Sequence, residues 1–224
     1  MKSARWSHIL FISLILVACS GKQPPAESLL SSSGQRTIIC WGDSLTAGNE
    51  DGSGVTYPDV LAQLSGDAVL NRGVGSQTSG QILARAKGER IQADISIIWI
   101  GRNNSDHPEQ VLSDIESLVE MLPPPKHFLV LSVLNSYHAA IGRKEYSNIR
   151  SINNALEHKY GEHYLDVRSI LLSQYDWRDP VDLIDDWLGI VPSSLRYDNV
   201  HLNARGYEIV GRSVFDRLRH LKYL

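Results

Sequence analysis

The chain has 224 residues, which is enough for one domain of ordinary size or two small ones. Hydrophobic residues make up 42% of it and charged residues 21%, so the chain can bury a core. The 22 Lys and Arg nearly balance the 25 Asp and Glu, and this balance argues against a dedicated nucleic-acid binder, which usually carries a basic excess. Two cysteines exclude a disulfide-rich scaffold and a four-cysteine zinc site.

The N-terminal segment has the layout of a secretory signal peptide. Lys2 and Arg5 precede the apolar run 9–18, which is shorter than the roughly 20 apolar residues that span a bilayer. The run ends in Leu-Val-Ala-Cys, which resembles the lipobox of bacterial lipoproteins. The resemblance implies cleavage after residues 1–18 and lipid attachment to Cys19. A plain secretory signal followed by a chance cysteine is the alternative.

The segment 19–36 is rich in Ser, Gln and Pro and is expected to be a flexible tether. Ser20 stands where an Asp would suggest retention in the inner membrane. By resemblance to Gram-negative lipoproteins, this favours a lipid-anchored protein of the bacterial cell envelope, on the periplasmic side of an outer membrane if the organism has one. Loss of the two basic residues before Cys19 would change the net charge from −3 to −5. Cys40, in an apolar run, is expected to be a packed core residue.

Strand and helix signals alternate along residues 37–224. Short apolar runs predict five strands, and longer stretches between them predict helices. The predicted strands are 37–41, 68–70, 94–100, 127–134 and 164–167, and the predicted helices are 57–64, 78–87, 108–122, 146–160 and 203–218, the last with Asn203 as its N-cap. Such alternation predicts one α/β domain, a three-layer α/β/α sandwich around a five-stranded parallel sheet. Residues 171–197, rich in Trp, Tyr and Asp, break the pattern and predict a functional loop or a small subdomain.

Polar motifs follow the first three predicted strands, and a fourth precedes the last helix. In an open parallel sheet, ligands bind beyond the carboxyl ends of the strands. The motifs are Gly-Asp-Ser-Leu at 42–45, Asn-Arg-Gly-Val-Gly-Ser at 71–76, Gly-Arg-Asn-Asn at 101–104 and Asp-Asn-Val-His at 198–201. Their agreement with the predicted topology favours a functional site over chance. No His-Glu-x-x-His and no paired-cysteine spacing occurs, so no metal is expected.

With these motifs in this order, the sequence resembles the SGNH hydrolases, also called GDSL esterases/lipases, from about residue 37 to residue 218. The first and last motifs match fully. The third departs, because Asn104 stands where the family often has Asp, and the second departs, because Ser76 stands where the family has glycine. The resemblance implies a flavodoxin-like α/β fold and ester hydrolysis without a cofactor.

The residue types suit acyl transfer. A serine hydroxyl is a weak nucleophile, so Ser44 needs a general base, for which His201 is the candidate. Asp198 would hold the imidazole in one tautomer and stabilise its charged form. The resemblance implies an oxyanion hole formed by the N–H of Ser44, the N–H of Ser76 and the side-chain amide of Asn103. Gly75 is an alternative source of the second N–H.

The neighbours of these residues are expected to support them. Asp43 and Asn71 are predicted to brace the turns by hydrogen bonds. Arg102 either meets an anionic substrate group or forms a surface ion pair, and Trp41 is expected to pack in the core.

Together these signals predict a serine esterase that forms an acyl-enzyme on Ser44. Its expected substrates are O-acetyl groups on envelope or extracellular carbohydrate, because of the envelope location and the Trp- and Tyr-rich segment. The alternatives are a lipase, lysophospholipase or thioesterase, and a catalytically inactive glycan-binding lipoprotein, which the departures at Ser76 and Asn104 motivate. The expected partners are an ester substrate and the membrane, with no nucleic acid, and the protein is expected to be a monomer.

Overall fold

The computed structural model describes residues 34–48, 52–89 and 91–224. The predicted signal peptide, the predicted lipidation site Cys19 and most of the predicted tether lie outside these residues. The strands are β1 (Thr37–Gly42), β2 (Ala68–Gly73), β3 (Ile95–Trp99), β4 (Phe128–Leu131) and β5 (Tyr164–Leu165). All neighbouring strands are parallel, in the order β2-β1-β3-β4-β5. This is the flavodoxin-like order, in which β1 and β3 flank the switch point where ligands bind.

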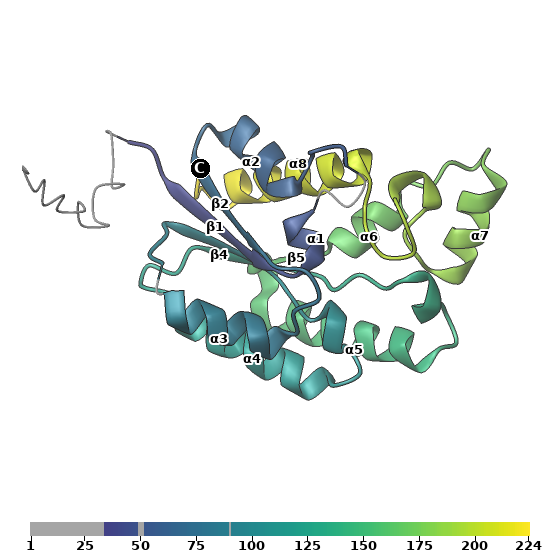
Figure 1. Ribbon diagram of the computed structural model, residues 1–224, viewed down its shortest axis with the longest axis horizontal. Coiled ribbons are helices and arrows are strands. Elements are labelled where there is room, and N and C mark those ends of the chain that lie inside the picture. Colours follow the sequence, from purple (N-terminus) through teal and green to yellow (C-terminus); the bar gives the residue numbers. More distant parts are fainter. Residues whose placement is uncertain (1–33, 49–51, 90) are drawn as a thin grey trace, which may run out of the picture. The chain divides into compact units, whose positions relative to one another are not determined.

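Helices cover both faces of the sheet, so the predicted three-layer α/β/α sandwich is confirmed (Figure 1). The helices are α1 (Ser44–Ala47), α2 (Tyr57–Ser65), α3 (Ser79–Glu89), α4 (Pro108–Glu120), α5 (Lys144–Tyr160), α6 (Val167–Leu172), α7 (Pro180–Leu188) and α8 (Ala204–His220), with 3-10 turns η1 (Arg102–Asn104), η2 (Tyr137–Ala139), η3 (Gly161–His163) and η4 (Ser193–Leu195). In Figure 1, α2 and α8 lie on one side of the sheet and α3, α4 and α5 on the other. Across the described ranges, no helix combines the length and apolarity that a membrane span requires.

The strands are mostly apolar, apart from Asn71 and Arg72 of β2 and Ser96 of β3, because each strand contributes to two cores. Successive side chains of a strand point to opposite faces. Ile38 and Cys40 of β1 therefore pack with α2 and α8, whereas Ile39 and Trp41 pack with α3 and α4. Cys40 is fully buried, as expected, and burial raises the pKa of its thiol to about 12, so it is no nucleophile.

The ends of the helices follow local rules. The side chain of Asn203 accepts a hydrogen bond from the N–H of Gly206, so the predicted N-cap of α8 is confirmed. Gly211 lets α8 lie close against α2, because a Cβ there would come within 2.6 Å of Val60.

Three predicted strands are shorter than expected: β3 by one residue at each end, and β4 and β5 mainly at their C-terminal ends. The apolar run after β4 leaves the sheet, because the side-chain amide of Asn153 bonds both the N–H and the carbonyl of Val133, at 2.8 and 3.0 Å. After β5, Asp166 caps α6 by accepting from the N–H of Ser169, so the helix begins where the strand was expected to continue. Side-chain hydrogen bonds that no apolar pattern reveals set both ends.

The segment 171–197 contains helix α7, whose polarity is the reverse of that in an ordinary surface helix. Asp182 and Asp185 are buried against the rest of the domain. The exposed side chains of α7 include Val181, Leu183, Ile184 and Trp187. An ordinary surface helix buries its apolar face instead. Residues 171–197 are thus partly helical and present an apolar surface.

Candidate active site

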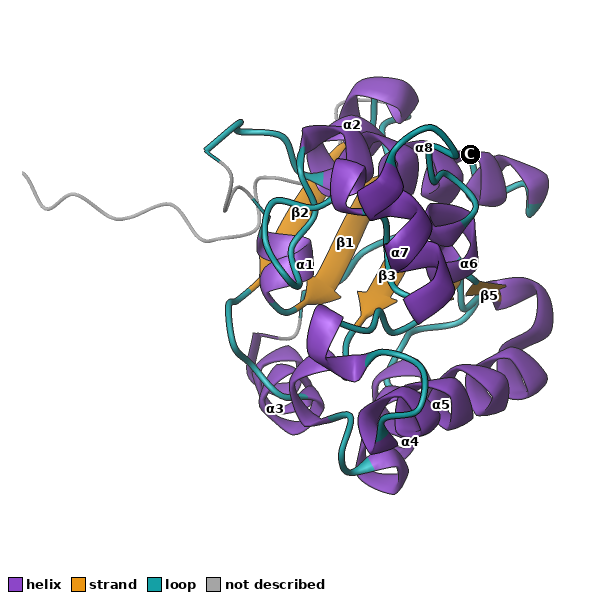
Figure 2. Ribbon diagram, turned by 90° about the vertical axis from the view of Figure 1, so that its right-hand side faces the viewer, coloured by secondary structure: helices purple, strands orange, loops and turns teal. Residues whose placement is uncertain are grey.

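The sheet brings the first three motifs to one edge. Gly42, the last residue of β1, pairs with Gly73 of β2 and with Trp99 of β3. The segments that follow these three positions therefore start side by side, and Figure 2 shows β1 and β3 ending at the same edge. Gly73 is needed for close packing, because a Cβ there would lie 2.0 Å from the backbone nitrogen of Ala47 in α1.

Ser44 opens the four-residue helix α1, directly after β1. Asp43 caps this helix by accepting a hydrogen bond from the N–H of Leu45 at 3.0 Å, which confirms its predicted bracing role. The Asp43 carboxyl is fully buried, and burial raises its pKa to about 6, although the N–H of Leu45 and the charges of Arg102 and His201 act in the opposite direction.

Ser44, His201 and Asp198 form a continuous hydrogen-bonded chain. His201 Nε2 lies 2.9 Å from Ser44 Oγ, and His201 Nδ1 lies 2.8 Å from Asp198 Oδ2. The partners come from 157 residues apart in the sequence, so only the fold unites them. Hydroxyl, imidazole and carboxylate thus stand in the order and at the distances that activate a serine nucleophile.

The Asp198 carboxylate is held in its charged form. Its partial burial alone would raise its pKa, but hydrogen bonds from the His201 ring and from the N–H groups of His201 and Val200 outweigh this and lower the pKa below its ordinary value. Asp198 Oδ1 accepts both N–H groups at 2.7 Å, which leaves Oδ2 for the imidazole. The carboxylate can therefore orient His201 throughout the neutral range.

The loop after β2 carries Ser76 in a strained conformation. Its φ is 63°, a left-handed value that favours glycine, whereas Gly75 has no positive φ. The substitution at this family position therefore keeps the glycine-like backbone. Asn71 fixes the loop by donating to the carbonyl of Thr46 at 2.9 Å and accepting from the N–H of Gly73 at 2.9 Å, which confirms the predicted brace.

Asn103 lies in η1, after β3, and connects this turn to the loop that follows β2. Its Nδ2 donates to the carbonyl of Gln77 at 3.0 Å, next to Ser76. An amide NH₂ has two donors, so this bond orients the group and leaves one N–H for a ligand. Arg85 holds Gln77 in turn, through Oε1 at 3.0 and 3.1 Å.

Asn104 is well accommodated despite its departure from the family pattern. It accepts from the N–H of Ser79 at 3.1 Å and donates to the hydroxyl of Ser79 at 2.9 Å, and that hydroxyl donates to buried Asp114 at 2.6 Å. An aspartate at this position has no N–H to give to Ser79. The asparagine therefore suits its neighbours and couples η1 to the start of α3.

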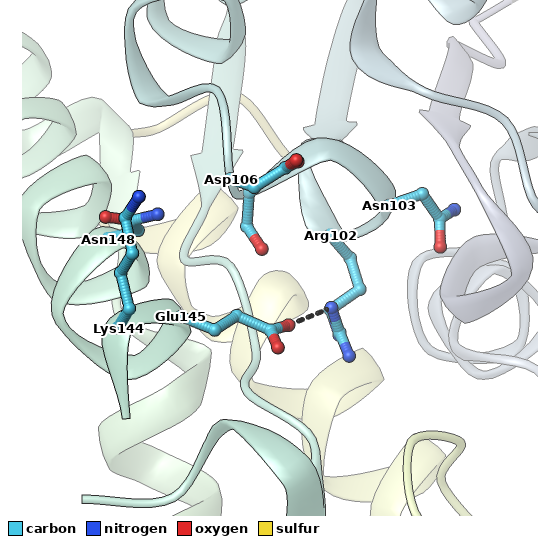
Figure 3. Close-up of a pocket in the computed structure, with 7 residues that line it drawn as sticks. Arg102, Asn103, Asp106, Lys144, Glu145 and Asn148 are labelled. Carbon is cyan, nitrogen blue, oxygen red and sulfur yellow. Dashed lines mark hydrogen bonds and ion pairs between the residues drawn. The ribbon is translucent and has the colours of Figure 1, made fainter. Parts of the chain in front are cut away.

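A polar pocket of about 440 Å³ adjoins the turn that carries Asn103 (Figure 3). Arg102 forms an ion pair with Glu145 at 2.8 Å in its wall, so the ion-pair alternative for this arginine is correct. The remaining labelled lining residues are Asp106, Lys144 and Asn148. Carboxylate, ammonium and amide groups thus face a space beside the proposed oxyanion donor. Within the described parts of the chain, no group of three or more His, Cys, Asp or Glu is placed to hold a metal ion.

Sequence reasoning missed the residues that hold the turn containing Asp198. Arg196 bonds the Asp198 carbonyl at 3.0 Å and forms a buried ion pair with Asp185 of α7 at 2.8 Å. Neither residue belongs to a motif. The Asp-rich stretch 176–186, which contains Asp185, is the available signal, but the sequence alone does not indicate Arg196 as its partner.

Comparison with known proteins supports the resemblance. The model of the GDSL-like Lipase/Acylhydrolase family matches residues 40–209. The chain is 28% identical over 161 residues to the platelet-activating factor acetylhydrolase IB subunit alpha1 of Rattus norvegicus, which covers 68% of this chain and 64% of the relative. The chain thus spans less than two thirds of the length of such curated relatives.

Solved structures share the fold. A member of the lipolytic protein G-D-S-L family from Veillonella parvula DSM 2008 superposes with a TM-score of 0.65 and 16% identity, over 80% of this chain and 96% of that one. AlinE4, an SGNH-hydrolase family esterase, superposes with a TM-score of 0.52 and 21% identity, over 85% and 98%. Because the family model matches more than half of the chain and includes all four motifs, the chain belongs to the GDSL-like Lipase/Acylhydrolase family.

Proposed function

We propose that the protein is a serine esterase that forms an acyl-enzyme on Ser44. The observation that carries this proposal is the chain from Ser44 Oγ through His201 to Asp198, at 2.9 and 2.8 Å. Ser44 Oγ attacks the ester carbonyl as its proton passes to His201 Nε2. The C–O bond of the ester then breaks, and the leaving alcohol takes that proton. Water, deprotonated by His201, releases the carboxylic acid and restores Ser44.

The negative oxygen formed in each step needs hydrogen-bond donors. We assign this role to the N–H groups of Ser44 and Ser76 and to the free N–H of the Asn103 amide. The left-handed φ of Ser76 and the Asn103–Gln77 hydrogen bond support the assignment, because both fix the donors before substrate arrives. Donors held in place in advance cost no reorganisation during the reaction.

The substrates are proposed to be O-acetyl groups on carbohydrate of the cell envelope or outside the cell. Three observations support this. The pocket beside Asn103 is lined by charged and amide groups that suit hydroxyl-rich alcohols. Trp177 and Trp187 are 67% and 78% exposed, and exposed aromatic rings can stack on sugars. The curated relative is named an acetylhydrolase, which supports acetyl as the acyl group.

A lipase or lysophospholipase is the second candidate. The exposed aliphatic side chains of α7 favour it, because aliphatic side chains suit an acyl chain better than a sugar. Purified protein would be assayed with p-nitrophenyl acetate, butyrate and octanoate, with O-acetylated polysaccharide and with a lysophospholipid. Preference for acetyl esters and acetate release from the polysaccharide support the first candidate, and preference for octanoate and the phospholipid supports the second.

A fluorophosphonate probe tests the catalytic assignment directly. The wild-type chain should be labelled on Ser44, and Ser44→Ala should abolish labelling and hydrolysis. The exposed residue Ser147 supplies a matched control, since Ser147→Ala removes a hydroxyl from α5 and should change neither. A wild-type protein that takes no label and hydrolyses none of the esters would instead support an inactive glycan-binding protein.

The protein is further proposed to be lipid-anchored through Cys19 in the cell envelope, on the periplasmic side of an outer membrane in a Gram-negative organism. The sequence pattern at residues 16–19 supports this. Cells fed an alkyne-bearing palmitate analogue should label the wild-type chain and leave Cys19→Ser unlabelled. Equal labelling of both, or labelling of neither, contradicts the anchor.

A further inference from the structure

The turn that carries Asp198 is poorly fixed by apolar packing. Residues 197–199 are exposed, and buried leucines flank the turn at Leu195 and Leu202. Hydrogen bonds close the turn internally, from the N–H of Tyr197 to the carbonyl of His201 at 2.9 Å. The precise placement of Asp198 relative to the sheet therefore depends on polar ties to other parts of the domain.

The guanidinium of Arg196 connects the turn with two other segments of the domain. Nη1 donates to the carbonyl of Asp198 at 3.0 Å, and Nε donates to the carbonyl of Val191 at 2.7 Å. Nη2 pairs with Asp185 Oδ2 at 2.8 Å. The group is planar and its donors are fixed relative to one another, so it acts as a rigid connection between α7 and the turn.

Helix α7 is itself attached to the chain just before the turn. Asp185 also accepts from the N–H of Ser193 at 2.6 Å, and Asp182 accepts from the N–H of Ser194 at 3.0 Å and from its hydroxyl at 2.6 Å. The reversed polarity of α7 follows from these bonds, because its carboxylates must face inward to make them.

The buried ion pair is hard to explain by stability alone. The side chains of Arg196 and Asp185 are 9% and 3% exposed, and removing two charges from water costs about as much free energy as their attraction returns. Such a pair fixes the position and orientation of the groups that it joins, here the Arg196 guanidinium and helix α7. Other bonds also hold the turn, among them the one from the N–H of Tyr137 to the carbonyl of Asn199 and the one between His201 Nε2 and Ser44 Oγ, and neither of these two is made by Asp198.

We infer that Arg196, oriented by Asp185 of α7, is a positioning residue that sets Asp198 and thereby His201 against Ser44. It touches neither the substrate nor the reacting atoms. Its effect is on kcat, since displacement of a catalytic group by about 1 Å can cost roughly 100-fold in rate. This inference rests on the proposed catalytic roles of Ser44, His201 and Asp198.

The test uses the full chain and p-nitrophenyl acetate. Arg196→Lys keeps the charge and loses the three-way fork, and Asp185→Asn keeps the shape and loses the charge. We expect kcat per active site, counted by fluorophosphonate titration, to fall about 10- to 100-fold in each, with KM within about twofold. Arg212→Lys on α8 and Asp186→Asn on α7 are matched controls at exposed positions and should be unchanged.

A merely structural role would give a different pattern. It would lower the unfolding temperature and the fraction of labelled protein, while kcat per labelled site stayed within twofold of wild type, and that result overturns the inference. The double variant adds a second criterion. If Asp185 acts through Arg196, the double variant loses no more than the worse single variant, whereas multiplied losses contradict the connection. Full activity of Ser44→Ala would defeat the proposed function instead, so the two failures are distinguishable.

Discussion

The two halves of the candidate site are held by different kinds of structure. Ser44, Ser76 and Asn103 follow three neighbouring strands whose ends are paired through backbone hydrogen bonds. Asp198 and His201 lie off the sheet, in a turn between η4 and α8 that side-chain hydrogen bonds attach to α7. Many cooperative backbone bonds thus place the proposed nucleophile and the proposed oxyanion donors, and a few side-chain bonds place the proposed base His201 and its partner Asp198.

This difference predicts different responses to mutation. A ladder of backbone bonds survives the loss of any one side chain. Substitutions on the sheet side of the site, which comprises Ser44, Ser76 and Asn103, should therefore remove one chemical function and leave the rest in place. Substitutions on the turn side, which comprises Asp198, His201 and the residues that hold them, should lower the rate by displacing the imidazole even where no reacting group is removed. The chain offers tests of both statements, with expected effects from about 10⁴-fold in rate down to about 1 kcal/mol in stability.

Asp198→Asn tests the turn side and should have the largest effect of the four substitutions that test this comparison. The amide can still accept the N–H groups of Val200 and His201, but it cannot stabilise the charged imidazole. We expect kcat for p-nitrophenyl acetate to fall about 10⁴-fold with the fold intact by circular dichroism. Asp216→Asn, at an exposed position of α8, is the control. A loss below about tenfold would show that His201 works without its carboxylate.

Asn103→Ala tests the sheet side. It removes one oxyanion donor, so kcat should fall about 10²- to 10³-fold while KM changes little. Because the strands hold the neighbouring loops, the labelled fraction should remain at wild-type level. Asn154→Ala removes an exposed amide from α5 and should have no effect. A large loss of folded protein in Asn103→Ala would break the comparison, because it would mean that the Gln77 hydrogen bond and not the sheet holds the loops.

Asp43→Asn tests the free-energy cost of a buried, charged carboxylate next to Ser44. The folded-state pKa of Asp43 is about 6, above its ordinary 3.8, so the folded state holds this proton more tightly than the unfolded state. Charging the Asp43 carboxyl therefore destabilises the folded state. This destabilisation is absent well below pH 4, grows as the pH rises towards 6 and is complete above it. The stability advantage of Asp43→Asn over wild type, from urea unfolding, should grow by about 2 kcal/mol between about pH 4.5 and about pH 7.5.

The exposed Asp216→Asn should show no such pH dependence. An advantage of Asp43→Asn that is independent of pH would contradict a buried, reluctantly charged carboxyl at position 43.

Ser76→Gly should have the smallest effect. Glycine relieves the left-handed conformation at φ 63° and should stabilise the protein by about 1 kcal/mol in urea unfolding. The backbone N–H is unchanged, so kcat should stay within about threefold. A tenfold loss of kcat would assign the Ser76 hydroxyl a part in the reaction, and the departure from the family pattern would then be functional.

Much of the sheet side was predictable from local sequence. Apolar runs located every strand, and polar motifs marked the ends of the first three. The Asp43 and Asn71 braces follow from residue types that hydrogen-bond nearby backbone. The turn side was predictable as a motif but not as an arrangement. The pattern Asp-x-x-His names Asp198 and His201, yet nothing around them in the sequence indicates Arg196 as their support.

Helix α7 shows why. Its apolar residues recur at helical spacing, a pattern that ordinarily marks the buried face of a helix. Here the buried face is the one with Asp182 and Asp185, because Ser193, Ser194 and Arg196 satisfy the carboxylates. A periodic pattern identifies the two faces of a helix. It does not indicate which face will be buried, because that depends on whether hydrogen-bond donors from elsewhere in the chain satisfy the polar face.

The sequence by itself determined the α/β class, the order of elements and the identity of the candidate residues, because apolar periodicity and short motifs act over a few residues. The tertiary structure alone decided which groups meet. It placed His201 against Ser44 across 157 positions, gave Ser76 its left-handed backbone and turned the carboxylates of α7 inward. These outcomes depend on desolvation and on hydrogen-bond partners distant in the chain, and such partners become neighbours only when the whole domain has folded.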